Sequence, residues 1–310
     1  MRRLLSRSGT LGLGAALCAC ALLPGFAAPL YASEHTLFFK LTDASGNPIT
    51  DLQSSQITVL EDGVQRETKS VELINWPTRL TVLVDNGPGT TSSLVDLRNG
   101  MKGLIDALPE GVEMSLYTIT PQPRPIVRFT ADHDALLKGL SLITPDSGAA
   151  RFLEGLQEAA KRIDADKSDH FPIILMVATD GPEGSAVRQR DIERLAKQLT
   201  DNHVRLHVAM LSLGGLRASA DSGVVQVQLG LSFTKMTGGR YENFNVTTRM
   251  ASLLPEFGQM IASGYRRQAN QYRITYERPA GATEPTQGIS ATTTRTGRGA
   301  LTFDGFVPEP

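Results

Sequence analysis

The chain has 310 residues, of which 31 are basic, 32 are acidic and 41% are hydrophobic. This length and apolar content exclude a disulfide-stapled miniprotein and a disordered chain. The net charge of −1 excludes a globally basic nucleic-acid binder, and an aromatic content of 6% argues against stacking platforms for single-stranded nucleic acid.

The N-terminus, residues 1–33, has the three-part pattern of a bacterial export signal. Three arginines and no acidic residue accompany an apolar run over 11–23, and small residues follow around Ala27 and Ala32. Because this run is short for a membrane span, we predict a signal peptide that is cleaved near Ala27 or Ala32. The protein is therefore expected to be periplasmic or secreted, with no transmembrane anchor after cleavage.

Both cysteines, Cys18 and Cys20, lie inside this predicted signal. A mature protein without cysteine has no disulfide, no cysteine zinc site and no cysteine nucleophile. The residues before Cys20 loosely fit a lipoprotein cleavage box, but the apolar stretch continues past it, which favours ordinary cleavage over lipidation.

Residues 35–76 are predicted to form an N-terminal β segment. Apolar residues alternate over 36–41, and a second apolar strand is expected at 57–60. The dipeptide Asp62-Gly63 then follows, which is the strongest short signal for a hairpin turn.

Residues 78–264 change to alternating strands and helices. Strands are expected at 80–84, 114–119, 125–129, 172–178, 206–211 and 241–244. Helices are expected at 94–108 and 192–199, where apolar residues recur at helical spacing, at 132–143, 151–163 and 250–263, and at 225–236 despite its β-branched residues. This alternation predicts an α/β domain with a doubly wound, mostly parallel six-stranded sheet.

The tail, residues 268–310, returns to β structure. Apolar and polar residues alternate over 271–277, and two further strands are expected at 288–294 and 300–306. Because three or more strands are needed for independent stability, we expect the N- and C-terminal flanks to pack together as one small β module.

Two of the predicted central strands end in an aspartate. Asp85 follows the first strand and leads into a glycine-rich turn, and Asp180 follows the strand at 172–178. Ligands of doubly wound sheets bind at the carboxyl ends of such strands. Carboxylate oxygens there are the kind of ligand that Mg²⁺ or Mn²⁺ prefers.

At these residues the sequence resembles a von Willebrand factor A domain over about 78–264. The likeness rests on Val-Leu-Val-Asp ending at Asp85, Leu-Pro-x-Gly at 108–111, Met-Val-Ala-Thr-Asp-Gly at 176–181 and Thr-Gly-Gly-Arg-Tyr at 237–241. The flanks are similar to a bacterial exported variety of that family, through Leu-Thr-Asp-x-x-Gly-x-Pro-Ile at 41–49 and Val-Leu-Glu-Asp-Gly-Val-Gln at 59–65.

The resemblance implies a metal-ion-dependent adhesion site with the pattern Asp-x-Ser-x-Ser, a middle-loop threonine and a second aspartate. Asp85 and Asp180 match the two aspartates, but Gly87 and Gly89 replace both serines and Ala149 stands where the threonine is expected. Hard cations need about six oxygens, so the site is predicted to be degenerate and to bind Mg²⁺ or Mn²⁺ weakly or not at all.

Two interpretations of these positions stay open. Thr90, Thr91 and Ser147 offer replacement oxygens if the glycine-rich loop is longer than in the family. Otherwise no resident cofactor is expected, Asp85 caps the following helix and Asp180 hydrogen-bonds loop amides.

No catalytic centre is predicted from the remaining motifs. The glycine-rich turn lacks the Gly-Lys-Ser/Thr of a P-loop and the full dinucleotide fingerprint, and neither His-Glu-x-x-His nor Gly-x-Ser-x-Gly occurs. The adjacent carboxylates Glu61 and Asp62 are predicted to lie in a turn, where they solvate a loop.

The predicted function is non-catalytic protein binding or adhesion outside the cytoplasm, through loops at the carboxyl edge of the sheet. The residues predicted to contact a protein partner are Asn86, Gly87, Gly89, Arg151, Pro182 and Glu183. One alternative is a structural or assembly partner of an envelope complex that acts through the β module. A less favoured alternative is a metal-dependent hydrolase using Asp85 and Asp180. No nucleic-acid partner is expected.

Overall fold

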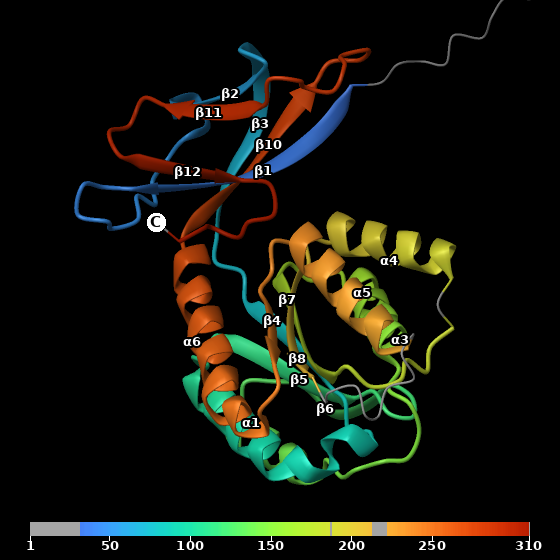
Figure 1. The fold of residues 1–310 in the computed structure, drawn as a ribbon. Coiled ribbons are helices and arrows are strands. Elements are labelled where there is room, and N and C mark those ends of the chain that lie inside the picture. Colours follow the sequence, from blue (N-terminus) through green and yellow to red (C-terminus); the bar gives the residue numbers. More distant parts are fainter. Residues whose placement is uncertain (1–31, 187, 213–221, 310) are drawn as a thin grey trace, which may run out of the picture.

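The computed structural model describes residues 32–186, 188–212 and 222–309 (Figure 1). The predicted signal at 1–33 therefore lies almost entirely outside the described residues. Two parts are visible, each built on a six-stranded sheet. Within the described residues, no helix combines the length and apolar content that crossing a bilayer needs.

The larger part is the predicted α/β domain. Its strands are β4 (Thr78–Val84), β5 (Val112–Thr118), β6 (Arg124–Thr130), β7 (Phe171–Thr179), β8 (Arg205–Leu211) and β9 (Tyr241–Phe244). They lie in the order β6-β5-β4-β7-β8-β9, and all neighbours are parallel except β5 and β6. Strand β6 is antiparallel because the short link from β5 leaves no room for a crossover helix. The prediction of a doubly wound, mostly parallel sheet is confirmed.

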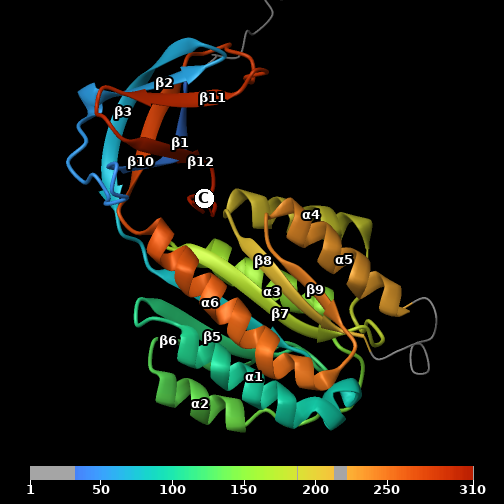
Figure 2. The same cartoon turned by 60° about the vertical axis from the view of Figure 1, so that its left-hand side comes forward.

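Helices cover both faces of this sheet (Figure 2). One face carries α1 (Leu94–Ala107), α2 (His133–Ser141) and α6 (Met250–Gln268), and the other carries α3 (Phe152–Ala165), α4 (Gln189–Asp201) and α5 (Ser222–Met236). Leu80, Val82 and Val84 of β4 belong to the core under α1, whereas Leu83 belongs to the core under α3. Because side chains alternate along a strand, one buried strand supplies both cores.

Helices α1 and α6 approach each other closely through two glycines. A Cβ atom on Gly100 would lie 2.3 Å from the carbonyl oxygen of Met250, and one on Gly258 would lie 2.7 Å from that of Leu104. The absence of side chains at these points therefore sets the spacing of the two helices. Short 3₁₀ turns at Ser54–Gln56, Pro88–Ser93 and Thr247–Arg249 complete the helical elements.

The second part is the β module, in which the two flanks of the chain pair. Its strands are β1 (Ser33–Thr42), β2 (Ile57–Glu61), β3 (Val64–Ile74), β10 (Gln271–Arg278), β11 (Ile289–Thr293) and β12 (Arg298–Thr302). All pairs in the order β11-β2-β3-β10-β1-β12 are antiparallel, and β1 lies between two strands of the C-terminal flank. The predicted packing of the flanks into one module is therefore confirmed.

The predicted hairpin at Asp62-Gly63 joins β2 to β3. Asp62 has a φ of 50° and Gly63 a φ of 79°, which is the pair of positive values that a type I′ turn requires. The side chain of Asp62 also accepts hydrogen bonds from the backbone N–H groups of Thr286, Gln287 and Gly288. Asp62 therefore joins the β2–β3 turn to the loop that precedes β11.

An aromatic cluster joins the two parts. Phe38 of β1 and Trp76 of the connecting segment have ring centroids 5.6 Å apart, and Trp76 lies 5.5 Å from Phe171 at the start of β7. Phe306, in the tail after β12, lies 5.9 Å from Phe171. Since Phe38, Phe171 and Phe306 are all buried, this apolar contact holds the β module on the α/β domain.

The prediction that Glu61 solvates a turn is wrong. Its side chain is 1% exposed and accepts hydrogen bonds from Tyr276 at 2.8 Å, Arg278 at 2.7 Å and Arg66 at 2.8 Å. Strand β3 lies between β2 and β10, so this buried ion pair crosses the interior of the curved sheet. Burial alone raises the pKa of Glu61, but the donors from Arg278, Tyr276 and Arg66 outweigh it and lower the pKa to about 2.

Replacing Glu61 with glutamine is expected to lower the free energy of unfolding by about 3–5 kcal/mol, because the Arg278 guanidinium is then buried without its counter-charge. Chemical denaturation of the wild type and of Glu61→Gln at neutral pH measures this difference.

Glu72→Gln is the matched control. Glu72 forms an exposed ion pair with Arg273 at 2.6 Å, and the loss of this pair is expected to cost less than about 1 kcal/mol of stability.

The pKa of Glu61 is lowered on folding, so the contribution of Glu61 to stability is complete above the ordinary pKa of 4.5 and is lost as the pH falls toward about 2. The difference between wild type and Glu61→Gln should therefore shrink in acid. Equal losses for both variants would contradict the buried pair.

Candidate functional site

The candidate site is the carboxyl edge of the central sheet, where the loops after β4, β5 and β7 meet. Asp85 directly follows β4, the strand that lies between β5 and β7. Its side chain is buried, with 2% exposure. A buried carboxylate needs hydrogen-bond donors, and the neighbouring strands supply them.

Two threonines and one backbone amide hold the carboxylate of Asp85. Thr179 at the end of β7 donates to Oδ2 at 2.6 Å, and Thr120 after β5 donates to Oδ1 at 3.0 Å. The N–H of Gly87 donates to Oδ1 at 2.8 Å. We call Asp85, Gly87, Thr120 and Thr179 the Asp85 clamp, because together they tie the ends of three adjacent strands.

The interpretation of Asp85 as a helix cap is wrong. The 3₁₀ turn Pro88–Ser93 has Gly87 at its N-cap position, and α1 begins after Ser93. Thr120 and Thr179 were not predicted as partners of Asp85. The one signal in the sequence was position, since each threonine lies at the carboxyl end of a predicted strand beside the one that ends in Asp85.

Glycine at position 87 is part of the clamp. A Cβ atom there would lie 3.0 Å from Oδ1 of Asp85 and 3.4 Å from Oγ1 of Thr120. The serine of the family pattern would therefore crowd the hydrogen bonds that the clamp makes. The family pattern has a serine hydroxyl at position 87. In this chain position 87 is glycine, and the hydroxyl beside Asp85 comes from Thr120, which follows the neighbouring strand β5.

The other predicted metal ligands do not converge on Asp85. Thr90 donates its hydroxyl to the carbonyl oxygen of Gly87 at 2.8 Å, while Thr91 and Ser147 are exposed. Asp180 is half-buried. Its charge acts on Tyr241 of β9, whose pKa is raised to about 12 by burial and, to a smaller extent, by this charge. In the described ranges no three His, Cys, Asp or Glu side chains form a metal-binding group. These residues do not fit the donor set of a hard divalent cation.

Several predicted partner-binding residues instead hold the loops in place. Asn86 is buried, donates to the carbonyl oxygen of Thr144 at 2.9 Å and accepts from the N–H of Thr120 at 3.3 Å. Arg151 donates to the carbonyl oxygen of Pro121 at 3.0 Å and pairs with Glu154. The loops that follow β4 and β5 and the loop at 144–151 are thereby fixed to one another.

Glu183 lies against the start of α3. Its Oε1 atom accepts from the N–H of Ser185 at 2.8 Å. Burial raises the pKa of Glu183, whereas hydrogen bonds from Ser185 and from the backbone of Leu153 and Phe152 oppose the shift. This carboxylate therefore interacts with the N-terminal end of the helix dipole.

Charged side chains at this edge are paired with each other, as in Arg124 with Asp146 and Arg151 with Glu154, and uncharged residues are exposed between them. Gly87 is buried and Gly89 is half-buried. We define the carboxyl-edge surface by its exposed residues Pro88, Thr91, Ser92, Ser147, Gly148 and Pro182. All five histidines of the chain lie elsewhere, in the β module or near the opposite edge of the sheet. The exposed groups are thus hydroxyls, backbone atoms and proline rings.

No protein-family model matches the sequence, and no curated protein matches it. A solved structure of a von Willebrand factor type A protein from Catenulispora acidiphila is similar at a TM-score of 0.50 and 10% identity, over 89% of this chain and 72% of that one. BatB from Bacteroides thetaiotaomicron has a TM-score of 0.43 at 12% identity, over 59% of this chain and 98% of its own. The manganese-loaded TRAP protein of Plasmodium vivax has a TM-score of 0.43 at 16% identity, over 75% of this chain and 95% of its own.

The likeness to the Catenulispora structure shows the fold. Because it covers 89% of this chain, it extends beyond residues 78–264 into the flanking strands. The chain therefore has the von Willebrand factor A fold that its motifs predicted.

Removing the hydroxyl of Thr179 is expected to destabilise the protein by about 1.5–3 kcal/mol, because Oδ2 of a buried carboxylate loses its donor. Thr179→Val keeps the shape of the side chain, and thermal or chemical unfolding measures the loss. Thr200→Val is the control, since Thr200 is exposed on α4 and its hydroxyl bonds only to the carbonyl oxygen of Ala196. If both variants lose the same stability, the clamp has no special role.

Proposed function

We propose that the chain is a non-catalytic protein-binding module that acts outside the cytoplasm, and that the carboxyl-edge surface contacts its partner. The observation that carries this proposal is the Asp85 clamp. The family resemblance implies a metal that completes its coordination with a carboxylate of the partner. Here both oxygens of Asp85 face donors from the chain itself, so contact rests on loop shape and hydrogen bonds.

The chemistry of the edge supports binding without catalysis. An enzyme brings a nucleophile, a base and a group that stabilises developing charge into one pocket. At this edge the exposed hydroxyls of Thr91, Ser92 and Ser147 lie without a histidine, and the carboxylate of Asp85 is engaged. The hydrolase alternative therefore has the weaker support.

The rigidity of the loops also supports recognition. Asn86 links the first loop to the loop at 144–151, and the clamp links the first loop to Thr120 and Thr179. Ordering loops at an interface costs free energy, and loops that are already held in place avoid that cost. A surface of exposed backbone and hydroxyl groups offers many donors and acceptors to a protein partner.

The second candidate function is assembly through the β module. Its sheet ends in β11 and β12, each of which has one hydrogen-bonded neighbour, and Val64 on the β2–β3 hairpin is 54% exposed. An edge strand with free backbone groups is a template for pairing with another chain. This observation favours a role in an envelope complex if the carboxyl-edge surface proves inert.

Divalent cations are expected to bind weakly or not at all. Calorimetric titration of the full chain with Mg²⁺ and with Mn²⁺ tests this expectation, because the hydrogen bonds to Asp85 compete with metal coordination. A dissociation constant in the micromolar range that is lost in Asp85→Ala would contradict it and would show that the hydroxyls of Thr90 or Thr91 serve as ligands.

Partner capture from an envelope extract of the native host is expected to survive EDTA and to fall about tenfold in Ser147→Arg and Pro182→Arg, because a long charged side chain blocks the centre of the contact surface. Quantitative pull-down with the full chain measures retention. Val64→Arg is the control on the β module. Loss of capture in Val64→Arg with full capture in Ser147→Arg would move the contact to the β module, and loss with EDTA would restore a metal-dependent mode.

A further inference from the structure

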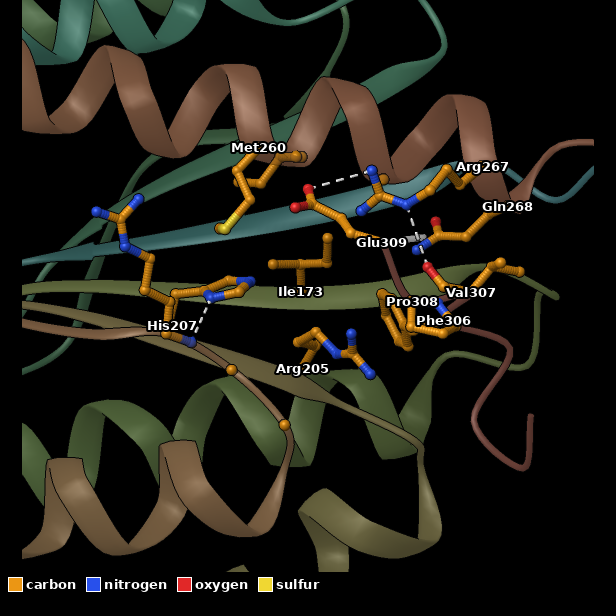
Figure 3. A pocket seen from close by; sticks show the side chains of 15 residues that line it. Ile173, Arg205, His207, Met260, Arg267, Gln268, Phe306, Val307, Pro308 and Glu309 are labelled. Carbon is orange, nitrogen blue, oxygen red and sulfur yellow. Dashed lines mark hydrogen bonds and ion pairs between the residues drawn. The ribbon is translucent and has the colours of Figure 1, made fainter. Parts of the chain in front are cut away.

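A separate cavity lies at the opposite, amino edge of the central sheet (Figure 3). Its volume is about 540 Å³, which falls within the usual range of small-molecule pockets. It is enclosed by α6, the first residues of β8 and the tail after β12. Its lining includes the apolar residues Ile173, Met260, Ile261, Phe306, Val307 and Pro308.

One end of the cavity is cationic. Arg267 of α6 donates to the carbonyl oxygen of Val307 at 3.2 Å and lies 3.4 Å from the carboxylate of Glu309, whose side chain is 69% exposed. Lys40 of β1 lies beside it and donates to the carbonyl oxygens of Arg267 and Ala269 at 2.7 and 2.8 Å. Burial and the charge of Arg267 lower the pKa of Lys40, as expected where positive charge is in excess.

The other end presents an unused hydrogen-bond donor. His207 is 4% exposed, and its Nδ1 atom accepts the backbone N–H of Arg240 at 2.9 Å. Burial, with the charges of Arg205 and Arg240, lowers the pKa of His207 to about 3, so the ring is neutral and its proton is on Nε2. No hydrogen bond from Nε2 is found among the described residues, and Figure 3 shows that nitrogen on the cavity side, near Ile173.

The two arginines at this end already have carboxylate partners. Arg205 pairs with Asp304 at 2.7 Å, and Arg240 pairs with Glu242 at 2.7 Å. Two donors at this end therefore remain for a ligand, namely the Nε2–H group of His207 and the Nε–H group of Arg205, which is buried without a hydrogen-bond partner among the described residues. A buried donor without an acceptor is costly. An acceptor oxygen that enters the cavity would remove that cost.

We propose that this cavity binds a linear dicarboxylate. One carboxylate replaces that of Glu309 at Arg267, the hydrocarbon middle lies along Ile173 and Met260, and the second carboxylate accepts the hydrogen bond from Nε2 of His207. Glu309, a residue of the cavity lining, shows that a carboxylate on this side reaches Arg267 (Figure 3). Because its ion pair is long and exposed, Glu309 is a weak competitor that a ligand displaces.

The test is calorimetric titration of the full chain with the series of dicarboxylates from succinate to suberate, which scans the span between the two ends. The monocarboxylate and the diol with the chain length of the best binder complete the set. Saturable binding is expected to be tightest for the dicarboxylate, about tenfold weaker for the monocarboxylate and weakest for the diol, because each charge-assisted hydrogen bond contributes separately.

Variants separate the two ends. Arg267→Gln is expected to weaken the dicarboxylate about tenfold, whereas Glu309→Gln removes the competing carboxylate and is expected to tighten it about two- to fivefold. His207→Asn keeps an acceptor near Nδ1 and removes Nε2, so it should weaken the dicarboxylate and leave the monocarboxylate unchanged. Arg266→Gln is the matched control, since Arg266 is exposed on α6 and does not line the cavity.

Several results would overturn the proposal. They are the absence of saturable binding by every member of the series, equal affinity for the acid and the diol, and unchanged affinity in Arg267→Gln. A gain in affinity in Glu309→Gln does not arise from misfolding, so the test stands even if Arg267→Gln proves unstable. The outcome is independent of partner capture at the carboxyl edge, which lies at the other end of the sheet.

Discussion

A buried carboxylate needs hydrogen-bond donors around it, and Asp85 lies buried at the end of a central strand of the sheet. The donors are Thr120 after β5, Thr179 at the end of β7 and the backbone N–H of Gly87. Position 87 then has to stay small, because a Cβ atom would lie 3.0 Å from the same carboxylate. One buried charge thus determines the residue types on three strand ends and the course of the first loop.

The same sheet has two edges with opposite chemistry. At the carboxyl edge the carboxylate of Asp85 is hydrogen-bonded internally, and the carboxyl-edge surface exposes hydroxyls, glycine and proline. The amino edge has an apolar cavity with Arg267 at one end and an unused imidazole donor at the other. Polar groups that are already satisfied favour broad contact with a macromolecule, whereas an unsatisfied donor beside an apolar wall favours a small ligand. The fold therefore offers two separate sites without a shared residue.

Local patterns in the sequence were enough to predict most of the fold. The hairpin at Asp62-Gly63 depended on backbone preference alone. Alternating strands and helices were predicted correctly because most of the helices carry an apolar stripe, whereas α5 is apolar without a distinct stripe. Strand β6 was recognised as a strand, but its direction depends on the link to β5 and was not predicted.

The site was less predictable because its contacts join distant parts of the chain. Thr179 and Asp85 are 94 residues apart, and Glu61 and Arg278 are 217 residues apart. A carboxylate in a turn sequence is usually solvated, and only the curvature of the sheet brings Arg278 across the interior to Glu61. The cavity depends on Phe306 and Glu309 of the tail, whose positions follow from the packing of the β module rather than from any motif.

The place of β1 in the β module has a consequence for biosynthesis. This strand is made first, yet its hydrogen-bonding partners on both sides, β10 and β12, are made last. Leu37, Phe39 and Leu41 therefore stay without their native cover until the C-terminal flank has left the ribosome. The intervening α/β domain consists of sequential strand–helix units, whose contacts are nearer in the sequence and are expected to form earlier. The β module therefore closes only after its C-terminal flank has been synthesised.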